Sequence, residues 1–192
     1  MNFLDTIKTD LIQAKMLKEE DKLSKCKFFY LFIKSKTCRI HTFVRLRSAN
    51  ILLSYIAKKY LDRYFIEIGK NTKIGNYFFM PHPRCIIIAN NVVLGDNVHV
   101  AQYVTIGGNF KKTKLLDNGE VQKLPIIGSR VMIHPSSVIG GPVTIGDDVI
   151  VGANSTITKD IPSNSIAFAQ NTLANKKIKV PKDGGSFEVI SL

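Results

Sequence analysis

Aliphatic residues recur at every sixth position over most of the chain after residue 65. The spacing holds in three stretches, from 68 to 80, from 88 to 106 and from 127 to 157. A period of six fits neither a helix of 3.6 residues per turn nor an isolated strand that alternates every two residues. It predicts a solenoid of short strands, each with one inward-facing aliphatic side chain. The thirteen residues on this grid are Ile68, Ile74, Met80, Ile88, Leu94, Val100, Ile106, Ile127, Ile133, Ile139, Ile145, Val151 and Ile157.

Glycine often follows the aliphatic residue of the repeat. Because glycine has no Cβ and tolerates positive φ, we expect it to form the turn between successive strands. The glycines at this position are Gly69, Gly75, Gly95, Gly107, Gly128, Gly140, Gly146 and Gly152.

The first 65 residues have a different period, with apolar residues at helical spacing. We predict helices over residues 3–20, 22–34 and 40–64, and a cap formed by Asn2 and Asp5. The whole pattern predicts a mainly β fold with an N-terminal helical region. The expected division is a helical region (1–65), a repeat domain (66–175) and a C-terminal tail (176–192).

The six-residue period is interrupted twice. Met80 and Ile88 are eight residues apart, and Pro81-His82-Pro83 lies between them. The prolines fix φ and remove backbone donors, so they hold the histidine on a stiff segment that cannot pair as a regular strand. From the residues alone, this segment is either a bulge with a surface histidine or a functional site.

The second interruption is longer and lies between Ile106 and Ile127. Its residues 109–123 contain Asn118-Gly119, a turn signal flanked by apolar residues, which predicts a small hairpin projecting from the solenoid. Lysines 111, 112 and 114 make the insertion basic.

The charge is unevenly distributed within a net value of +12. Residues 1–64 hold 14 Lys and Arg against 6 Asp and Glu, whereas residues 65–192 hold 13 against 9. This balance suits an anionic partner such as an acidic glycan, a phosphorylated cofactor or a membrane surface. The sequence has no nucleic-acid-binding motif, which argues against that class of partner. We interpret the basic helix faces as solvated surface, in preference to peripheral contact with the inner face of a membrane.

Compartment and redox state follow from the apolar runs and the cysteines. No stretch approaches the ~18–20 apolar residues that a membrane span needs. Asp5 and Asp10 interrupt what would be the apolar core of a signal peptide, which predicts a cytoplasmic protein. Cys26, Cys38 and Cys85 form no CxxC pair, so we expect three reduced thiols and no metal site.

The segment from about 66 to 175 resembles the hexapeptide-repeat acyltransferase family. Its stretch "IEIGKNTKIGNYFFMPHPRCIII…NNVVLGDNVHVAQYVTIGG" is similar to the serine acetyltransferase branch and its sugar-modifying relatives. The resemblance implies a left-handed parallel β-helix with three hexads per coil, an exception to the usual right-handed crossover. It also implies a homotrimer and acetyl-coenzyme A as the donor.

The resemblance also implies roles for single residues. The catalytic base of the pattern falls on His82, and the acidic residue that orients it falls on Glu67. A neutral imidazole takes the proton of an acceptor hydroxyl, and a carboxylate sets its tautomer. Backbone N–H groups of the Gly107-Gly108 turn are the candidate oxyanion stabilisers. The coenzyme-binding positions fall on Gly108, Pro135, Ala153, Thr158, Lys159 and Lys176.

The chain also departs from the serine-specific pattern. Pro81 stands where those members have an acidic residue, and Lys123-Leu124-Pro125 stands where they have an "RHP" motif. Both missing groups would help to hold a small zwitterion. The tail also lacks the family's "GxPA" turn near 169–172. We therefore favour an O-acetyltransferase that acts on a hydroxyl of a bacterial surface glycan (capsule, exopolysaccharide or lipopolysaccharide) or its precursor.

Three alternatives remain open. The first is a serine O-acetyltransferase of cysteine biosynthesis. The second is a zinc enzyme like the γ-type carbonic anhydrases, with His82, His99 and His134 as ligands. The third is a non-catalytic trimeric scaffold. His41, which lies in the helical region, is interpreted as a packing or surface residue.

Overall fold

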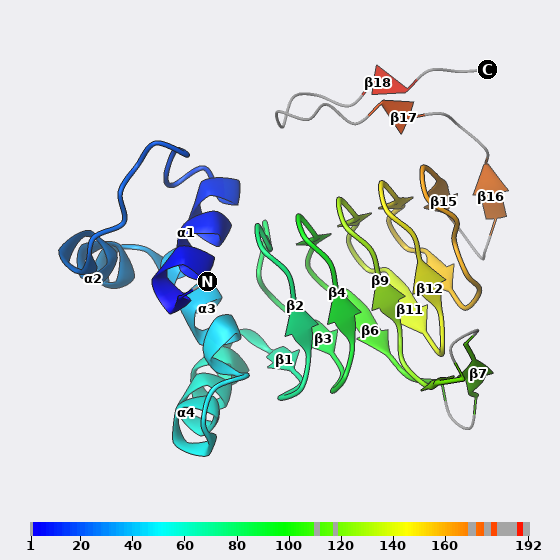
Figure 1. Cartoon of the computed structure of the whole chain (residues 1–192), viewed down its shortest axis with the longest axis horizontal. Helices are drawn as coiled ribbons and strands as arrows, with labels where there is room; N and C mark the ends of the chain where they lie inside the picture. Colours follow the sequence, from blue (N-terminus) through cyan, green and yellow to red (C-terminus); the bar gives the residue numbers. More distant parts are fainter. Residues whose placement is uncertain are drawn as a thin grey trace.

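The structure is a computed structural model that describes residues 2–109, 112–116, 119–168, 172–174, 178–179 and 188–189. A group of N-terminal helices leads into a stack of short parallel strands (Figure 1). The helices are α1 (Phe3–Gln13), α2 (Lys25–Lys34), α3 (Lys36–Leu46) and α4 (Ile51–Leu61), and a 3-10 turn, Asp62–Tyr64, joins α4 to the first strand.

The helical prediction was right in kind, but several boundaries were wrong. Helix α2 begins at Lys25 rather than at residue 22, and α3 begins at Lys36 rather than at residue 40. The first helix ends at Gln13 rather than at residue 20, because the chain turns at Lys15, whose φ is 56°. The expected single helix over 40–64 is two helices, because Asn50 caps a new one by accepting from the Leu53 N–H at 3.0 Å. The predicted cap at Asn2 and Asp5 is confirmed, with both reciprocal hydrogen bonds present.

Three parallel sheets form the three faces of the β-helix, and the chain visits them in turn. The solenoid predicted from the six-residue period is therefore confirmed. Sheet I contains β1 (Ile66–Ile68), β3 (Ile86–Ile88), β6 (Thr105–Gly107), β11 (Val138–Gly140) and β14 (Thr156–Ile157). Sheet II contains β2 (Lys73–Ile74), β4 (Val93–Leu94), β9 (Ile126–Ile127) and β12 (Thr144–Ile145). Sheet III contains β5 (His99–Val100), β10 (Met132–Ile133), β13 (Ile150–Val151) and β15 (Ile166–Phe168).

The end of the chain departs from the parallel pattern. Strand β16 (Thr172–Ala174) pairs antiparallel with β15, and β17 (Ile178–Lys179) pairs antiparallel with β18 (Glu188–Val189). The division into a helical region, a repeat domain and a tail stays a prediction.

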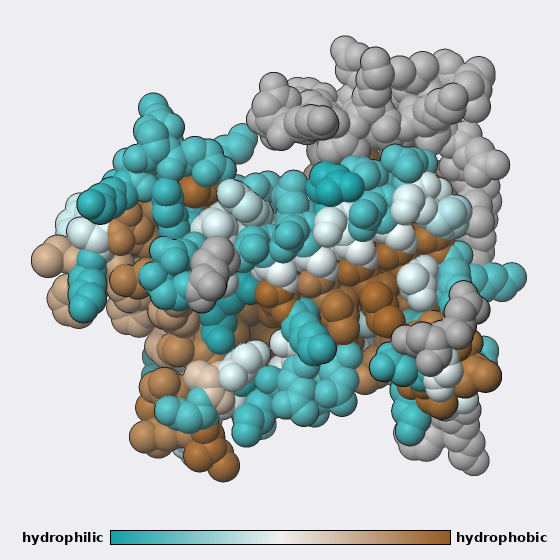
Figure 2. All heavy atoms as spheres, in the orientation of Figure 1, coloured by the Kyte–Doolittle hydropathy of each residue, from teal (hydrophilic) through white to brown (hydrophobic). Residues whose placement is uncertain are grey.

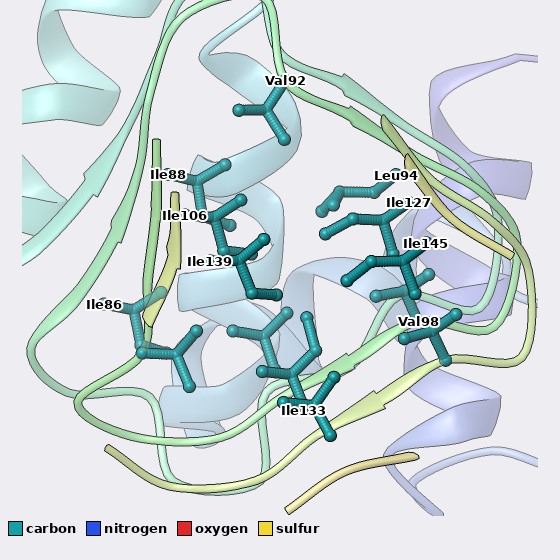
Figure 3. Close-up of a cluster of buried hydrophobic side chains, with 14 of the residues drawn as sticks. Ile86, Ile88, Val92, Leu94, Val98, Ile106, Ile127, Ile133, Ile139 and Ile145 are labelled. Atoms are coloured by element: carbon teal, nitrogen blue, oxygen red, sulfur yellow. The ribbon is translucent and has the colours of Figure 1, made fainter. Parts of the chain in front are cut away.

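The aliphatic grid is the core of the β-helix. Twelve of its thirteen residues are at most 2% exposed, and Ile74, at the helix-covered end, is half-buried against the same cluster. Figure 3 shows Ile88, Ile106 and Ile139 from sheet I facing Leu94, Ile127 and Ile145 from sheet II across the interior. Parallel pairing in register, as in Ile88 opposite Ile106, stacks like residues above one another. The inward orientation of the grid is thus confirmed.

The glycines of the repeat have a different role from the one expected. Among the described residues, positive φ occurs at only two glycines, Gly119 and Gly141, and the corners use non-glycine residues in this conformation instead. A Cβ added to Gly75 would lie 2.4 Å from the Gly95 carbonyl oxygen of the next coil. Glycine is therefore needed at such positions because successive coils approach closely, and the turn explanation was wrong.

A buried charge cluster joins the helices to the first coil. Asp10 on α1 accepts from Arg45 on α3 at 2.7 and 2.6 Å, and also from the Phe78 N–H at 3.0 Å. Arg45 in turn donates to the carbonyl oxygens of Ile74 and Gly75. His41 is fully buried beside this cluster, which confirms that it is a packing residue.

The predicted hairpin is present within the 109–123 insertion. Strands β7 (Lys114–Leu115) and β8 (Val121–Gln122) pair antiparallel, whereas residues 110, 111, 117 and 118 lie outside the described part of the chain. The buried amide of Gln122 anchors the hairpin by donating to the carbonyl oxygens of Leu124 and Val143. Lys114 pairs with Asp160, so it is not the free cation that the sequence indicated.

Apolar side chains also reach the surface of the helical region. Ile51 and Leu52 on α4 are 80% and 65% exposed, and Phe29 on α2 is 64% exposed. Figure 2 shows hydrophobic surface over both helices. No helix within the described ranges is both long enough and apolar enough to cross a membrane. Cys26, Cys38 and Cys85 are free thiols.

Candidate active site

His82 lies on an exposed loop at the corner between sheets III and I. The loop follows the bridge between Phe79 and His99 and precedes β3. The two extra residues of this interruption bulge outward, and the chain regains the regular corner at Arg84 and Cys85. There the Tyr103 N–H donates to the Arg84 carbonyl at 3.2 Å, and the Cys85 N–H donates to that of Tyr64 at 3.0 Å.

A cavity of about 390 Å³ opens beside His82. Lys36 and Thr37, from the start of α3, form one wall of it. Arg84, Gln102 and Tyr103, from the corner itself, line the rest together with the two prolines. The helical region and the β-helix therefore build this cavity jointly.

The cavity is cationic and contains no carboxylate among its lining residues. Lys36 and Arg84 are exposed, and neither forms an ion pair with any residue that the structure describes. The Lys36 ammonium lies 4.5 Å from the ring centroid of Tyr64. The side-chain oxygen of Gln102 is buried and has no hydrogen-bond partner. The two exposed cations suit an anionic ligand.

Glu67 lies outside this cavity. It points outward from β1, opposite Ile87 of β3, and lines a second cavity of about 240 Å³ with Arg47 and Lys58. Within the described residues of the single chain, no hydrogen bond or ion pair joins it to His82. The orientation of His82 by Glu67 thus stays a prediction.

The expected coenzyme positions line the two edges of sheet I. Pro135 and Ala153 belong to successive coils of the corner that carries His82: the Ser136 N–H donates to the backbone carbonyl of Gln102, and the Asn154 N–H donates to that of Pro135. Pro135 is half-buried and Ala153 is exposed. Their coils stack above that of His82 at the ~4.8 Å strand spacing.

Gly108, Thr158 and Lys159 lie at the opposite edge of sheet I, where the strands end. The pairing of Gly107 with Gly140, and of Ile139 with Ile157, brings these residues to one corner on different coils. The hairpin also reaches this corner, because Lys114 pairs with Asp160. Lys176 lies outside the described residues.

Sequence reasoning did not find Lys36, Thr37 or Arg84 as candidate site residues. Arg84 directly follows Pro83, so its proximity to the histidine was a usable signal. Lys36 and Thr37 belong to a helix far from His82 in the sequence, and no spacing rule connects the two segments.

The zinc alternative gains no support within the single chain. Among the described residues, no group of three or more His, Cys, Asp and Glu side chains is placed to hold a metal ion. His99 contacts α1 instead, because its Nε2 lies 2.6 Å from the amide nitrogen of Gln13. Burial lowers the pKa of His99 below its usual range.

The comparisons with known proteins agree on the repeat. Residues 125–159 match the family model "Bacterial transferase hexapeptide (six repeats)". The galactoside O-acetyltransferase of Escherichia coli is 40% identical over 106 residues, which cover 54% of this chain and 52% of the relative. The serine acetyltransferase of Helicobacter pylori is 32% identical over 102 residues, with 53% and 56% covered.

Solved structures of serine acetyltransferases share the fold. The enzyme of Neisseria gonorrhoeae superposes with a TM-score of 0.73 at 19% identity, covering 95% of this chain and 70% of that one. Isoform 3 of Entamoeba histolytica, solved with cysteine, gives 0.65 at 24% identity and covers 93% and 61%. This likeness includes the N-terminal helices as well as the parallel sheets.

This chain spans about half the length of the curated relatives that it matches. The six-residue aliphatic grid, the three stacked parallel sheets and the match to the family model point to the same group of proteins. The repeat region of this chain is therefore similar in sequence and fold to the bacterial hexapeptide-repeat transferases.

Proposed function

We propose that this protein is an acetyl-coenzyme A-dependent O-acetyltransferase, with a hydroxyl of a bacterial surface glycan or its precursor as the acceptor. The observation that carries the proposal is the cavity beside His82, which joins a histidine, two unpaired cations and an aromatic ring. The names of the relatives support acetyl transfer to oxygen, and the galactoside enzyme supports a sugar acceptor.

In this mechanism His82 accepts the proton of the acceptor hydroxyl while the hydroxyl oxygen attacks the acetyl carbonyl. The C–S bond of the thioester then breaks, and the protonated His82 returns the proton to the departing sulfur, so that the coenzyme leaves as a thiol. Positioned general-base help of this kind contributes about 10²–10⁴-fold to the rate. The coenzyme supplies an acetyl thioester. Backbone N–H groups at Gly107 and Gly108 would stabilise the oxyanion, and Glu67 would orient the histidine.

The proposal places the coenzyme along sheet I. Pro135 and Ala153 lie along its first edge, and Lys159 supplies a phosphate-pairing cation at the other. The resemblance adds a homotrimer, in which the outward face of sheet I would meet a neighbouring copy, and a left-handed coil. The exposed side chains of Ile87 and Val138 on that face suit such an interface.

Serine acetyltransferase is the second candidate, and the structural likeness that extends over the helices favours it. A serine acceptor carries an ammonium group, which normally needs a carboxylate partner. The residues that line the cavity include none, and Pro81 occupies the position where the serine-specific pattern has one. This chemistry favours the glycan acceptor.

The test is release of thiol from acetyl-coenzyme A by wild type and by His82→Ala. Three acceptor conditions are compared: de-O-acetylated surface glycan of the source cell, L-serine, and no acceptor. We expect release with glycan, reduced about 10²–10⁴-fold in the variant. Since His82 is exposed, the thermal midpoint of the variant should match that of wild type.

Each other outcome points elsewhere. Thiol release with L-serine but not with glycan would identify serine as the acceptor in place of the glycan. Full activity of His82→Ala would remove the histidine from the mechanism. No thiol release by wild type in any condition would favour the scaffold, and stoichiometric zinc in the pure protein would support the zinc enzyme.

A further inference from the structure

We infer that the cavity beside His82 is a subsite for an anionic group on the acceptor sugar, and that Lys36 and Arg84 select for it. The inference rests on the proposed function and narrows its substrate class to acidic glycans. The anionic group is a carboxylate, as in a uronic acid, or a phosphate ester, since both present oxygens to the same cations.

The two cations are the first support for this assignment. Both line the cavity, both are exposed, and neither pairs with a carboxylate of the described chain. The other arginines of the helical interface differ in this respect: Arg45 is bound to Asp10, and Arg47 donates to the Ile68 carbonyl and to Ser54. Lys36 and Arg84 are thus left available for a ligand.

The start of α3 adds a second source of positive potential. Lys36 and Thr37 are its first two residues, and the Ser35 side chain caps it by accepting from the Cys38 N–H at 3.2 Å. The first turn contains no acidic side chain that would neutralise the helix dipole. The leading N–H groups of a helix favour an anion, and here they adjoin the lysine.

The remaining walls suit a sugar rather than a small anion alone. The Tyr103 ring is 55% exposed at the cavity and offers an apolar face for sugar C–H groups. Gln102 also lines the cavity, although its side-chain oxygen is buried and does not face the ligand space. His82 shares the cavity with these groups, so an acidic sugar held by Lys36 and Arg84 presents its hydroxyls to the proposed base.

The phosphates of the coenzyme are the competing anion. The expected coenzyme residues lie on later coils or at the other edge of sheet I, whereas Lys36 and Arg84 lie at the coil of His82 itself. This separation assigns the two cations to the acceptor.

The experiment measures binding by calorimetry to the full chain. The probes are oligogalacturonate, the same oligosaccharide after reduction of its carboxyl groups, and galactose 6-phosphate beside galactose. The variants are Lys36→Gln and Arg84→Gln. Lys22→Gln is the control, since it removes the same charge from an exposed loop residue that does not line the cavity. Michaelis constants for acetyl-coenzyme A are measured in parallel.

We expect at least one acidic probe to bind several-fold more tightly than its neutral counterpart, and the better acidic probe identifies the anion. Lys36→Gln and Arg84→Gln should each weaken that binding by about 5-fold, whereas Lys22→Gln should change it less than about 2-fold. Neutral sugars and the Michaelis constant for acetyl-coenzyme A should not respond.

Equal binding of acidic and neutral probes, or no binding of any, would overturn the subsite. If Lys22→Gln weakened binding of the acidic probe as much as the cavity variants do, the preference would come from the net charge of the protein and not from a subsite. A raised Michaelis constant for acetyl-coenzyme A in the cavity variants would assign the two cations to the coenzyme. The two proposals fail separately. If the acidic probe bound selectively but His82→Ala stayed active, only the proposed catalytic role of His82 would fail. If the enzyme acetylated a neutral glycan and the Lys36 and Arg84 variants did not change that rate, only the subsite would fail.

Discussion

His99 shows how a single residue of the repeat acquires a role from its surroundings. It occupies an outward position next to the buried Val100. Helix α1 covers it: Gln13 contacts its Nε2, and the ring packs edge-on against Phe79 at 5.5 Å. Burial disfavours the charged imidazolium, which lowers the pKa of His99 from its usual 6.5.

A lowered histidine pKa predicts a loss of stability in acid. Below pH 6.5 the unfolded chain binds a proton at this position more readily than the folded chain, so the free energy of unfolding falls as the pH drops through 6.5 toward the folded pKa of His99. We expect His99→Gln to lose less stability than wild type between about pH 7.5 and 5.5. Urea unfolding at the two pH values measures this, and identical pH dependence in both proteins would contradict it.

At the scale of the element, the unit that folds is the coil rather than the strand. Strands of two or three residues have no stability of their own, and they persist because each pairs with the coils above and below. Close stacking explains glycine at Gly75, where an added Cβ would meet the Gly95 backbone. At Gly140 an added Cβ would meet nothing within 4 Å, so close packing does not explain why this position of the repeat is glycine.

The two glycines therefore predict opposite effects of one substitution. Gly75→Ala should lower the free energy of unfolding by about 1–3 kcal/mol, because the coils must separate locally. Gly140→Ala should be neutral or raise it by about 0.4–1 kcal/mol, because φ is not positive there and alanine reduces the entropy of the unfolded chain. Denaturant unfolding measures the free energy of unfolding of both variants. Equal losses would show that contact with the neighbouring coil does not determine the cost of replacing these glycines.

At the scale of the molecule, the Asp10–Arg45 cluster holds the helices on the β-helix. Asp10 is completely buried, and each of its contacts crosses from α1 to α3 or to the first coil. Since α3 also carries Lys36, this docking positions the wall of the cavity that faces His82. Stability and the proposed specificity thus depend on the same interface.

Breaking the cluster from one side should be costly. Asp10→Ala leaves the nearly buried Arg45 charge without a carboxylate partner, so we expect a loss of about 3–5 kcal/mol in the free energy of unfolding. Asp148→Ala is the matched control. It breaks a bidentate pair with Arg130 that is partly solvated, and it should cost no more than about 1 kcal/mol. Chemical denaturation measures the free energy of unfolding of both variants. Similar losses would contradict the conclusion that burial makes the Asp10–Arg45 pair costly to break.

Much of the fold followed from the sequence because a solenoid builds its core from local repeats. The period of six located the buried residues and the two interruptions, and Asn118-Gly119 indicated the hairpin. Helix boundaries were less accurate, because the break before α4 depends on a cap at Asn50 within a continuous apolar pattern. His82 was found from its flanking prolines and from resemblance.

The stack of coils follows from the six-residue repeat alone, since each aliphatic residue meets the same neighbours in every coil. The surroundings of the loop that carries His82 depend on tertiary contacts. Lys36 and Thr37 reach its cavity because Asp10 and Arg45 dock α3 against the first coil, and Gln102 reaches it because successive corners stack. Such contacts join segments far apart in the chain. Their geometry depends on tertiary packing, which produces no repeating pattern in the sequence.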